Sequence, residues 1–134
     1  MKIRQAEEQD IEQIKKFVSE CLKEIYGTAN RLEDLDNLDN YLIFYIAIDG
    51  RIVGTIGLTN QGRLRRLYVD KEYRRQGIGK QLLDKLIKIA KENNINRIVL
   101  STYNKNKEAI NFYKKHGFHI DRKIKSRIYM NRKL

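Results

Sequence analysis

The segment from Val69 to Leu83 limits the possible folds of this 134-residue chain more than any other part of it. An apolar strand pattern passes through a basic turn with two glycines, Gly77 and Gly79, directly into an amphipathic helix. Glycine permits a positive φ and a close approach of ligand to backbone, and the first amides of a helix have no partner within it. The basic side chains of the turn are Arg74, Arg75 and Lys80. Together with the helix dipole they favour an anion, so the segment predicts a phosphate-binding turn.

Two common phosphate-binding motifs do not fit this turn. A P-loop has four residues between its glycines and then Lys-Ser or Lys-Thr, and a dinucleotide-binding fingerprint has a third glycine where Leu82 stands. The pattern Arg74-x-x-Gly77-x-Gly79 instead resembles the pyrophosphate loop of the GNAT N-acetyltransferase superfamily. Taken alone, the same residues also suit a glycine-rich strand-to-helix turn with solvated arginines.

A second pattern, about thirty residues downstream, is similar to the other signature of this superfamily. That signature has Asn-x-x-Ala, a Tyr four residues later and then Gly-Phe. The matching positions here are Asn106, Ala109, Tyr113, Gly117 and Phe118. The two motifs have the expected order and separation, with one helix and one strand predicted between them. The resemblance extends over the whole chain, which we therefore interpret as one GNAT-type domain covering residues 1–134.

Hydrophobic periodicity divides the chain into alternating helices and strands. Helices are expected at Glu8 to Ile25, at Gly77 to Glu92 and between Asn106 and Gly117, with a shorter helix or turn at Arg31 to Leu38. Strands are expected at Ile3 to Ala6, Leu42 to Ile48, Ile52 to Leu58, Leu64 to Val69, Arg97 to Thr102, Phe118 to Lys123 and Arg127 to Asn131. The predicted fold is mixed α/β: a mostly antiparallel, twisted sheet of six or seven strands with about four helices.

Composition excludes several other classes of protein. No apolar stretch approaches the length of roughly 18 residues that spans a membrane, and acidic residues interrupt any signal-peptide core near the start. Cys21, the single cysteine, lies on an apolar helix face and is expected to be buried and unreactive, which suits a reducing cytoplasm. His116 and His119 are too few to form a metal site, so we expect no metal. The missing apolar stretch likewise leads us to expect no membrane partner.

Charge is distributed unevenly along the chain. Residues 1–60 hold 7 basic and 11 acidic side chains, a net charge of −4, whereas residues 61–134 hold 21 and 6, a net charge of +15. A basic half that builds the coenzyme site would steer a phosphorylated ligand inward, and an acidic half could attract a cationic amine. The acidic candidates are Glu24, Glu33, Asp34, Asp36 and Asp39. The charges also suit solvated helix surfaces alone.

The resemblance implies a set of coenzyme-binding residues and one catalytic residue. The strand edge Leu67, Tyr68 and Val69 would pair with the pantetheine arm, and this strand and the next would splay apart. The loop residues Arg74, Arg75, Gln76, Gly77, Ile78, Gly79 and Lys80 would hold the pyrophosphate, and Asn106 and Ala109 would contact the arm. Tyr113 would be the general acid for the leaving thiolate, since its ordinary pKa of about 10 keeps it protonated. Tyr113 also suits a plain core position.

The general base is not identified by the sequence. Some relatives have a glutamate on the strand before the glycine loop, where this chain has Arg63, Arg65 and Arg66. Ordered water, Glu24 and Asp34 remain open as alternatives. At least one of Arg65 and Arg66 should point inward, and a buried guanidinium needs an anionic partner. This partner is either an acidic residue of the first two helices or a carboxylate on the acceptor.

Acetyl-CoA-dependent N-acetylation of a primary amine is the function that the sequence predicts, by direct attack in a ternary complex because no nucleophile is apparent. The amine would belong to a small molecule, a peptide or a protein, and the enzyme would be a monomer or homodimer. Two alternatives remain. The net charge of +11 also suits a nucleic-acid-binding module, which would expose Tyr103, Tyr113 and Tyr129 beside basic residues. A catalytically silent domain that binds coenzyme A as a sensor is the other.

Overall fold

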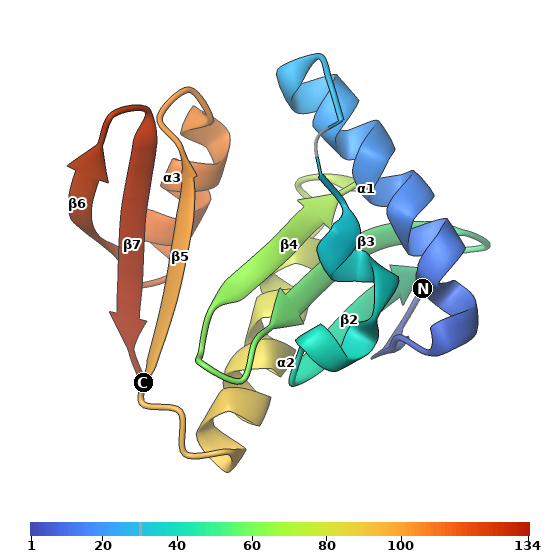
Figure 1. Ribbon diagram of the computed structural model, residues 1–134, viewed down its shortest axis with the longest axis horizontal. Helices are drawn as coiled ribbons and strands as arrows, with labels where there is room; N and C mark the ends of the chain where they lie inside the picture. The colour runs from blue at the N-terminus through green and yellow to red at the C-terminus, as the bar shows by residue number, and fades with distance from the viewer. Residues whose placement is uncertain (30) are drawn as a thin grey trace.

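The computed structural model describes residues 1–29 and 31–134 and contains two antiparallel sheets (Figure 1). One sheet has the order β1-β2-β3-β4 and the other the order β5-β7-β6. The strands are β1 (Lys2–Gln5), β2 (Ile43–Ile48), β3 (Ile52–Leu58), β4 (Leu64–Val69), β5 (Arg97–Tyr103), β6 (His119–Ile124) and β7 (Arg127–Lys133). The helices are α1 (Ile11–Tyr26), α2 (Ile78–Glu92) and α3 (Lys107–Lys115), with short 3₁₀ helices at Glu8–Asp10, Glu33–Asp36, Leu38–Asn40 and Lys71–Tyr73.

The mixed α/β fold predicted from the sequence is confirmed, with two refinements. The seven strands divide into sheets of four and three, and the short element predicted at Arg31 to Leu38 consists of two 3₁₀ turns. Residue 30, which lies at the border of that predicted element, is outside the described residues. The helix predicted from Glu8 starts as a 3₁₀ turn, and it ends where Gly27 takes a φ of 80°.

The four-stranded sheet is covered by helices on both faces (Figure 1). Strand β2 shows why: Phe44 and Ile46 pack with α1, whereas Ile43 and Ala47 pack with α2. Because successive side chains of a strand point to opposite faces, one apolar run serves two cores. The core on the α2 side continues into the second sheet and α3, so it holds the two halves of the domain together.

The two sheets touch at the start of β4 and β5 and then separate (Figure 1). Among the described residues, one parallel bridge, Arg63 with Val99, joins these strands, and the Val99 amide donates to the Gly62 carbonyl at 3.0 Å. Further along, β4 pairs with β3 on one side, and its other edge, from Leu67 to Val69, faces the gap. The divergence that the resemblance implied is therefore present, and it exposes a strand edge.

A bulge in β4 turns Arg66 inward to a buried ion pair. The pairing with β3 shifts register between Thr55 and Gly57, Arg66 has a φ of 60°, and the Thr55 hydroxyl donates to the Arg66 carbonyl at 2.7 Å. The Arg66 guanidinium contacts the two Asp34 carboxylate oxygens at 2.6 and 3.1 Å, and both side chains are largely buried, at 10% and 14% exposure. The partner of the inward arginine is thus an acidic residue of the helical segment, not a carboxylate on the acceptor.

The Asp34 carboxylate should contribute strongly to stability, since its loss leaves a buried cation unpaired. We expect Asp34→Asn to lower the free energy of unfolding by about 3 kcal/mol in urea denaturation at pH 7. The matched control is Asp36→Asn. The Asp36 carboxylate is 55% exposed and pairs with Lys15, so its loss should lower the free energy of unfolding by less than about 1 kcal/mol. Equal effects of the two substitutions would contradict the assignment.

The same pair predicts a pH dependence. Burial alone would raise the pKa of Asp34, but hydrogen bonds from Arg66 and Tyr41 outweigh it, and the pKa lies below its ordinary value. A carboxyl group with a lowered pKa stabilises the fold above its unfolded pKa and loses this contribution as the pH falls through the folded one. The stability difference between wild type and Asp34→Asn should therefore shrink under acid conditions.

Candidate functional site

Two cavities meet where β4 and β5 separate. One, which we call the loop cavity, has a volume of about 910 Å³ and lies against the Arg74 to Lys80 loop and α3. The other, the arginine cavity, has a volume of about 650 Å³ and lies between β4, β5 and β7. Both cavities are lined by Leu67, Tyr68, Asn106, Ala109 and Tyr113. These five residues, all predicted from the sequence as site residues, form the junction between the cavities.

The loop cavity contains most of the predicted phosphate-binding residues. Gly77 is the N-cap of α2 with a φ of 82°, and a Cβ at this position would meet open space. Its conformation therefore favours glycine, and the space around it is free for a ligand. The other lining residues predicted from the sequence are Val69, Arg74, Arg75, Ile78, Gly79 and Lys80. Gln76 does not line the cavity; it is exposed, and its side-chain amide donates to the Glu72 carbonyl at 3.3 Å.

Gly79 lines the loop cavity, but its backbone conformation differs from the one expected. Its φ is not positive, and a Cβ here would lie 3.3 Å from the ring of Phe112 on α3. The glycine thus allows α3 to approach the start of α2. Phe112 also packs against His116 in a tilted arrangement with ring centroids 4.5 Å apart, and both rings line the loop cavity. Sequence analysis missed this aromatic wall, because nothing local indicates that the two helices meet.

Arg74 is held by an acidic partner from the first helix. Its guanidinium contacts the Glu24 carboxylate at 2.7 and 3.0 Å, and its Nε donates to the Val69 carbonyl at 2.9 Å. A phosphate that binds Arg74 must compete with Glu24 or share the guanidinium with it. The carboxylates of Glu24 and Asp34, the two candidate bases, are therefore both bound by arginines. The pKa of Asp34 lies below its ordinary value, which makes this carboxylate a weaker base.

Tyr113 lies at the junction with a buried ring. It is 7% exposed and packs edge-on against Phe112 and Phe118, with centroids 5.6 and 5.4 Å away. Among the described residues its hydroxyl has no hydrogen-bond partner, although it lines both cavities. Burial raises the pKa of Tyr113 above its ordinary value, so the phenol is protonated at neutral pH and available as a donor.

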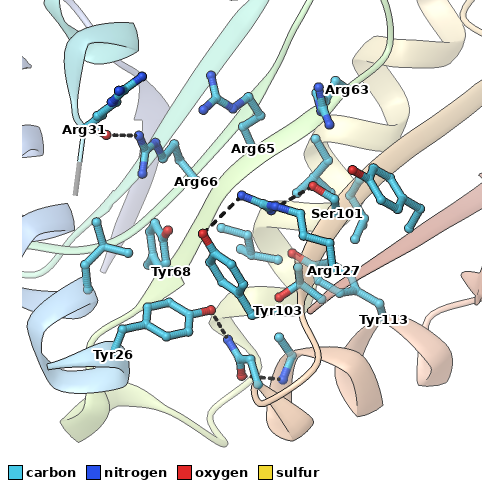
Figure 2. Close-up of a pocket in the computed structure, with 18 residues that line it drawn as sticks. Tyr26, Arg31, Arg63, Arg65, Arg66, Tyr68, Ser101, Tyr103, Tyr113 and Arg127 are labelled. Carbon is cyan, nitrogen blue, oxygen red and sulfur yellow. Dashed lines mark hydrogen bonds between the residues drawn. The ribbon is translucent and has the colours of Figure 1, made fainter. Parts of the chain in front are cut away.

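Asn106 and Ala109 occupy the first turn of α3. The Asn106 Oδ1 accepts from the Ala109 amide at 3.1 Å, as expected for a helix cap, and Nδ2 donates to the Tyr26 hydroxyl at 3.1 Å (Figure 2). The end of α1 therefore reaches α3 across the gap. Ala109, next to the cap, keeps this part of the junction open, because its side chain is small.

The arginine cavity contains side chains that sequence reasoning did not assign to the site. Arg127 on β7 donates to the Ser101 hydroxyl at 3.0 Å and to the Tyr103 hydroxyl at 3.4 Å, and its guanidinium lies 4.4 Å from the Tyr103 ring centroid (Figure 2). Tyr103 on β5 is the register partner of Arg127. The sequence predicted both strands, but it carries no local signal that they are neighbours.

The aromatic residues considered for nucleic-acid binding do not form an exposed platform. Tyr113 is buried, Tyr103 packs against Tyr26 and Arg127, and Arg122 covers the ring of Tyr129 at 4.9 Å. Bases stack on rings with a free face, so this arrangement does not favour the nucleic-acid alternative.

The cysteine and the two histidines form neither a nucleophile nor a metal site among the described residues. Cys21 is buried, as expected, and burial raises its pKa to about 12, so it is not a thiolate nucleophile at neutral pH. His116 ends α3 and His119 is exposed on β6. Within residues 1–29 and 31–134, no group of three or more metal-ligating side chains occurs, and no helix has the length and apolar character to cross a membrane.

Comparison with known proteins identifies the family. Residues 11–118 match the Acetyltransferase (GNAT) family. The chain is 33% identical over 110 residues to the probable N-acetyltransferase camello of Xenopus tropicalis, covering 71% of this chain and 50% of that protein. It is 30% identical over 112 residues to the spermidine N(1)-acetyltransferase of Thermoplasma acidophilum, covering 78% of this chain and 69% of that protein. The chain belongs to the GNAT acetyltransferase family and spans half the length of the camello protein.

A solved structure supports the same assignment. The PaiA N-acetyltransferase from Thermoplasma acidophilum, crystallised in complex with coenzyme A, superimposes with a TM-score of 0.85 at 25% identity. The alignment covers 99% of this chain and 98% of that one. The divergent sheets and the loop cavity described above therefore belong to a fold that accommodates coenzyme A in another member.

Two substitutions at position 77 that differ only in charge can test whether an anion binds there. Asparagine and aspartate both tolerate a positive φ and are nearly equal in size, so their difference in binding reports the charge. We expect Gly77→Asp to weaken acetyl-CoA binding at least about tenfold more than Gly77→Asn, because the carboxylate would face a pyrophosphate. Calorimetric titration measures this, with thermal unfolding as the control for folding. Equal binding by the two variants would place the pyrophosphate elsewhere.

Proposed function

We propose that this chain is a single-domain, cytoplasmic N-acetyltransferase that transfers the acetyl group of acetyl-CoA directly to a primary amine. The observation that carries the proposal is the junction itself. A protonated phenol with no hydrogen-bond partner in the described part of the chain, and an open strand edge, lie where the two cavities meet in the β4–β5 gap. A coenzyme in one cavity and an amine in the other would be in contact at this point.

The loop cavity suits the coenzyme. The amides at the start of α2 and the side chains of Arg75 and Lys80 would attract the pyrophosphate. The pantetheine arm contains amides, which would pair with the edge of β4 between Leu67 and Val69 as an added strand does, beside the Val69 carbonyl that accepts from Arg74. The thioester at the end of the arm would then reach Tyr113. Family membership and the coenzyme A complex of the Thermoplasma relative support this placement.

Tyr113 would assist departure of the sulfur. The amine nitrogen attacks the thioester carbon, the C–S bond breaks, the nitrogen loses a proton and the sulfur gains one. An ordinary thiol has a pKa of about 8.5, below that of a buried phenol, so complete transfer from Tyr113 is uphill. A hydrogen bond from the phenol to sulfur as charge develops, with proton transfer late, fits this order of acidity.

The proton of the attacking nitrogen would pass to water. Glu24 and Asp34 are bound to arginines, so neither carboxylate is an available base. The gap between the sheets is open on the acceptor side, which gives water access to the junction. An amine that arrives already neutral would need no protein base for the attack itself.

A calorimetric titration distinguishes this proposal from the nucleic-acid alternative. The purified protein is titrated with acetyl-CoA and, separately, with double-stranded DNA at about physiological salt. Stoichiometric binding of acetyl-CoA that tolerates salt is expected, because a defined cavity contributes most of the contacts. DNA binding that declines steeply as salt rises, without acetyl-CoA binding, would overturn the proposal.

Turnover by Tyr113→Phe distinguishes an enzyme from a silent coenzyme sensor. The substitution removes only a hydroxyl that has no hydrogen-bond partner among the described residues, so folding and acetyl-CoA affinity should be preserved. We expect kcat to fall about 100-fold, within the range typical of a lost general acid. Phe118→Leu, which changes a ring that packs against Tyr113 and lines neither cavity, is the packing control. A large loss of coenzyme binding in Tyr113→Phe would instead make the hydroxyl structural.

A further inference from the structure

We propose that the acceptor is an amine that also carries a carboxylate, and that Arg127 and Arg65 hold this carboxylate in the arginine cavity. The inference rests on the proposed function and specifies its substrate class. Both arginines line the arginine cavity and not the loop cavity, so a coenzyme bound at the phosphate loop would not contact them.

The arginine cavity is strongly cationic. Its lining includes no aspartate or glutamate among the described residues, but it includes five arginines: Arg31, Arg63, Arg65, Arg66 and Arg127. Asp34 compensates only one of these charges fully, because Arg66 contacts both of its carboxylate oxygens. The remaining positive charge surrounds the place where an acceptor would sit. A site of this kind attracts anions and repels a cationic chain such as a polyamine.

Arg127 is the arginine of this cavity that is best placed to bind an anion. Its hydrogen-bond partners are two hydroxyls, of Ser101 and Tyr103, and the described residues place no carboxylate within ion-pair distance of it. The Tyr103 ring contacts the guanidinium at 4.4 Å, and the two hydrogen bonds to hydroxyls hold it in place. A guanidinium that is fixed in this way binds a planar carboxylate through two parallel hydrogen bonds at little entropic cost.

Arg65 would supply a second contact. Its Nη1 lies 3.7 Å from an Asp34 oxygen that already accepts from Arg66, and its side chain is 40% exposed. Its charge is therefore only weakly compensated. Arg65 on β4 and Arg127 on β7 both line the arginine cavity, as do Tyr103 and the junction residue Tyr113 (Figure 2). An acid between the two guanidiniums would present its amine toward the junction.

Further arginines lie beside the arginine cavity. Arg63 and Arg65 also line a neighbouring depression of about 550 Å³ that contains Arg97 and Arg122 and one acidic residue, Asp121. A free amino acid would fill only the first cavity, whereas a peptide with acidic residues near its N-terminus would also reach the second. Both sources share an amine beside a carboxylate, and the experiment separates them.

The test compares initial rates of coenzyme A release with four acceptors. These are L-glutamate, a peptide with an amidated C-terminus that begins with three glutamates, the same amidated peptide with glutamines in their place, and spermidine. We expect a higher kcat/KM for an acid than for the glutamine peptide and spermidine. Turnover of L-glutamate would identify a small acid as the source, and turnover of the glutamate peptide alone would identify an acidic N-terminus.

Substitutions then assign the effect to the arginines. Arg127→Gln should reduce kcat/KM for the preferred acid at least about tenfold through KM, and it should leave the glutamine peptide nearly unchanged, since only a charge-assisted bond is lost. Lys88→Gln removes the same charge from the exposed face of α2, outside every cavity described above, and should have no effect. Arg65→Gln provides the same comparison if Arg127→Gln does not fold.

The outcomes separate this inference from the proposed function. Acetyl-CoA binding with spermidine as the best acceptor would keep the acetyltransferase and overturn the acidic acceptor. Acetyl-CoA binding with no turnover of either acid would also overturn it, as would equal losses for the acid and the glutamine peptide in Arg127→Gln. Absence of acetyl-CoA binding would remove the proposed function itself.

Discussion

The separation of β4 from β5 is the constraint on which the rest of the site depends. A continuous sheet would satisfy the edge of β4 with hydrogen bonds from β5, and no cavity would exist between them. Here the strands pair once, at Arg63 and Val99, and then diverge. The apolar core under α2 spans both sheets, so burial of side chains, rather than backbone pairing, holds the halves together. The backbone groups left open by the divergence become available to a ligand.

Charge pairing decides which arginines remain for ligands. Asp34 engages the inward arginine of β4, and Glu24 engages the first arginine of the glycine loop. Both carboxylates come from the acidic N-terminal half, which therefore neutralises particular cations of the basic half in addition to solvating helix surfaces. The arginine left with hydroxyl partners, Arg127, is supplied by the last strand. The uneven charge of the sequence thus becomes a division between arginines paired with carboxylates and an arginine with hydroxyl partners.

Most of the fold was predictable from the sequence, because periods of 2 and 3.6 residues are local properties. Strand β2 and helix α2 were predicted to within a residue, and Gly77, Asn106 and Tyr113 lie where the motifs indicated. Contacts between distant segments were not predictable in this way. Glu24 meets Arg74 across fifty residues, and Tyr103 meets Arg127 through a strand pairing that no local pattern encodes. The close packing of Gly79 against Phe112 was not predicted for the same reason, since Phe112 comes from another helix.

The hydrogen bond between Tyr26 and Asn106 closes the far end of the gap, just as the Arg63–Val99 bridge closes the near end. The opening between the sheets is therefore bounded by a contact at each end, and we call it the window. In the proposed reaction the thioester and the amine would meet in this window from opposite faces, and neither would have to pass the other. Each product would then leave through the face by which its precursor arrived, so the two departures need not wait for one another.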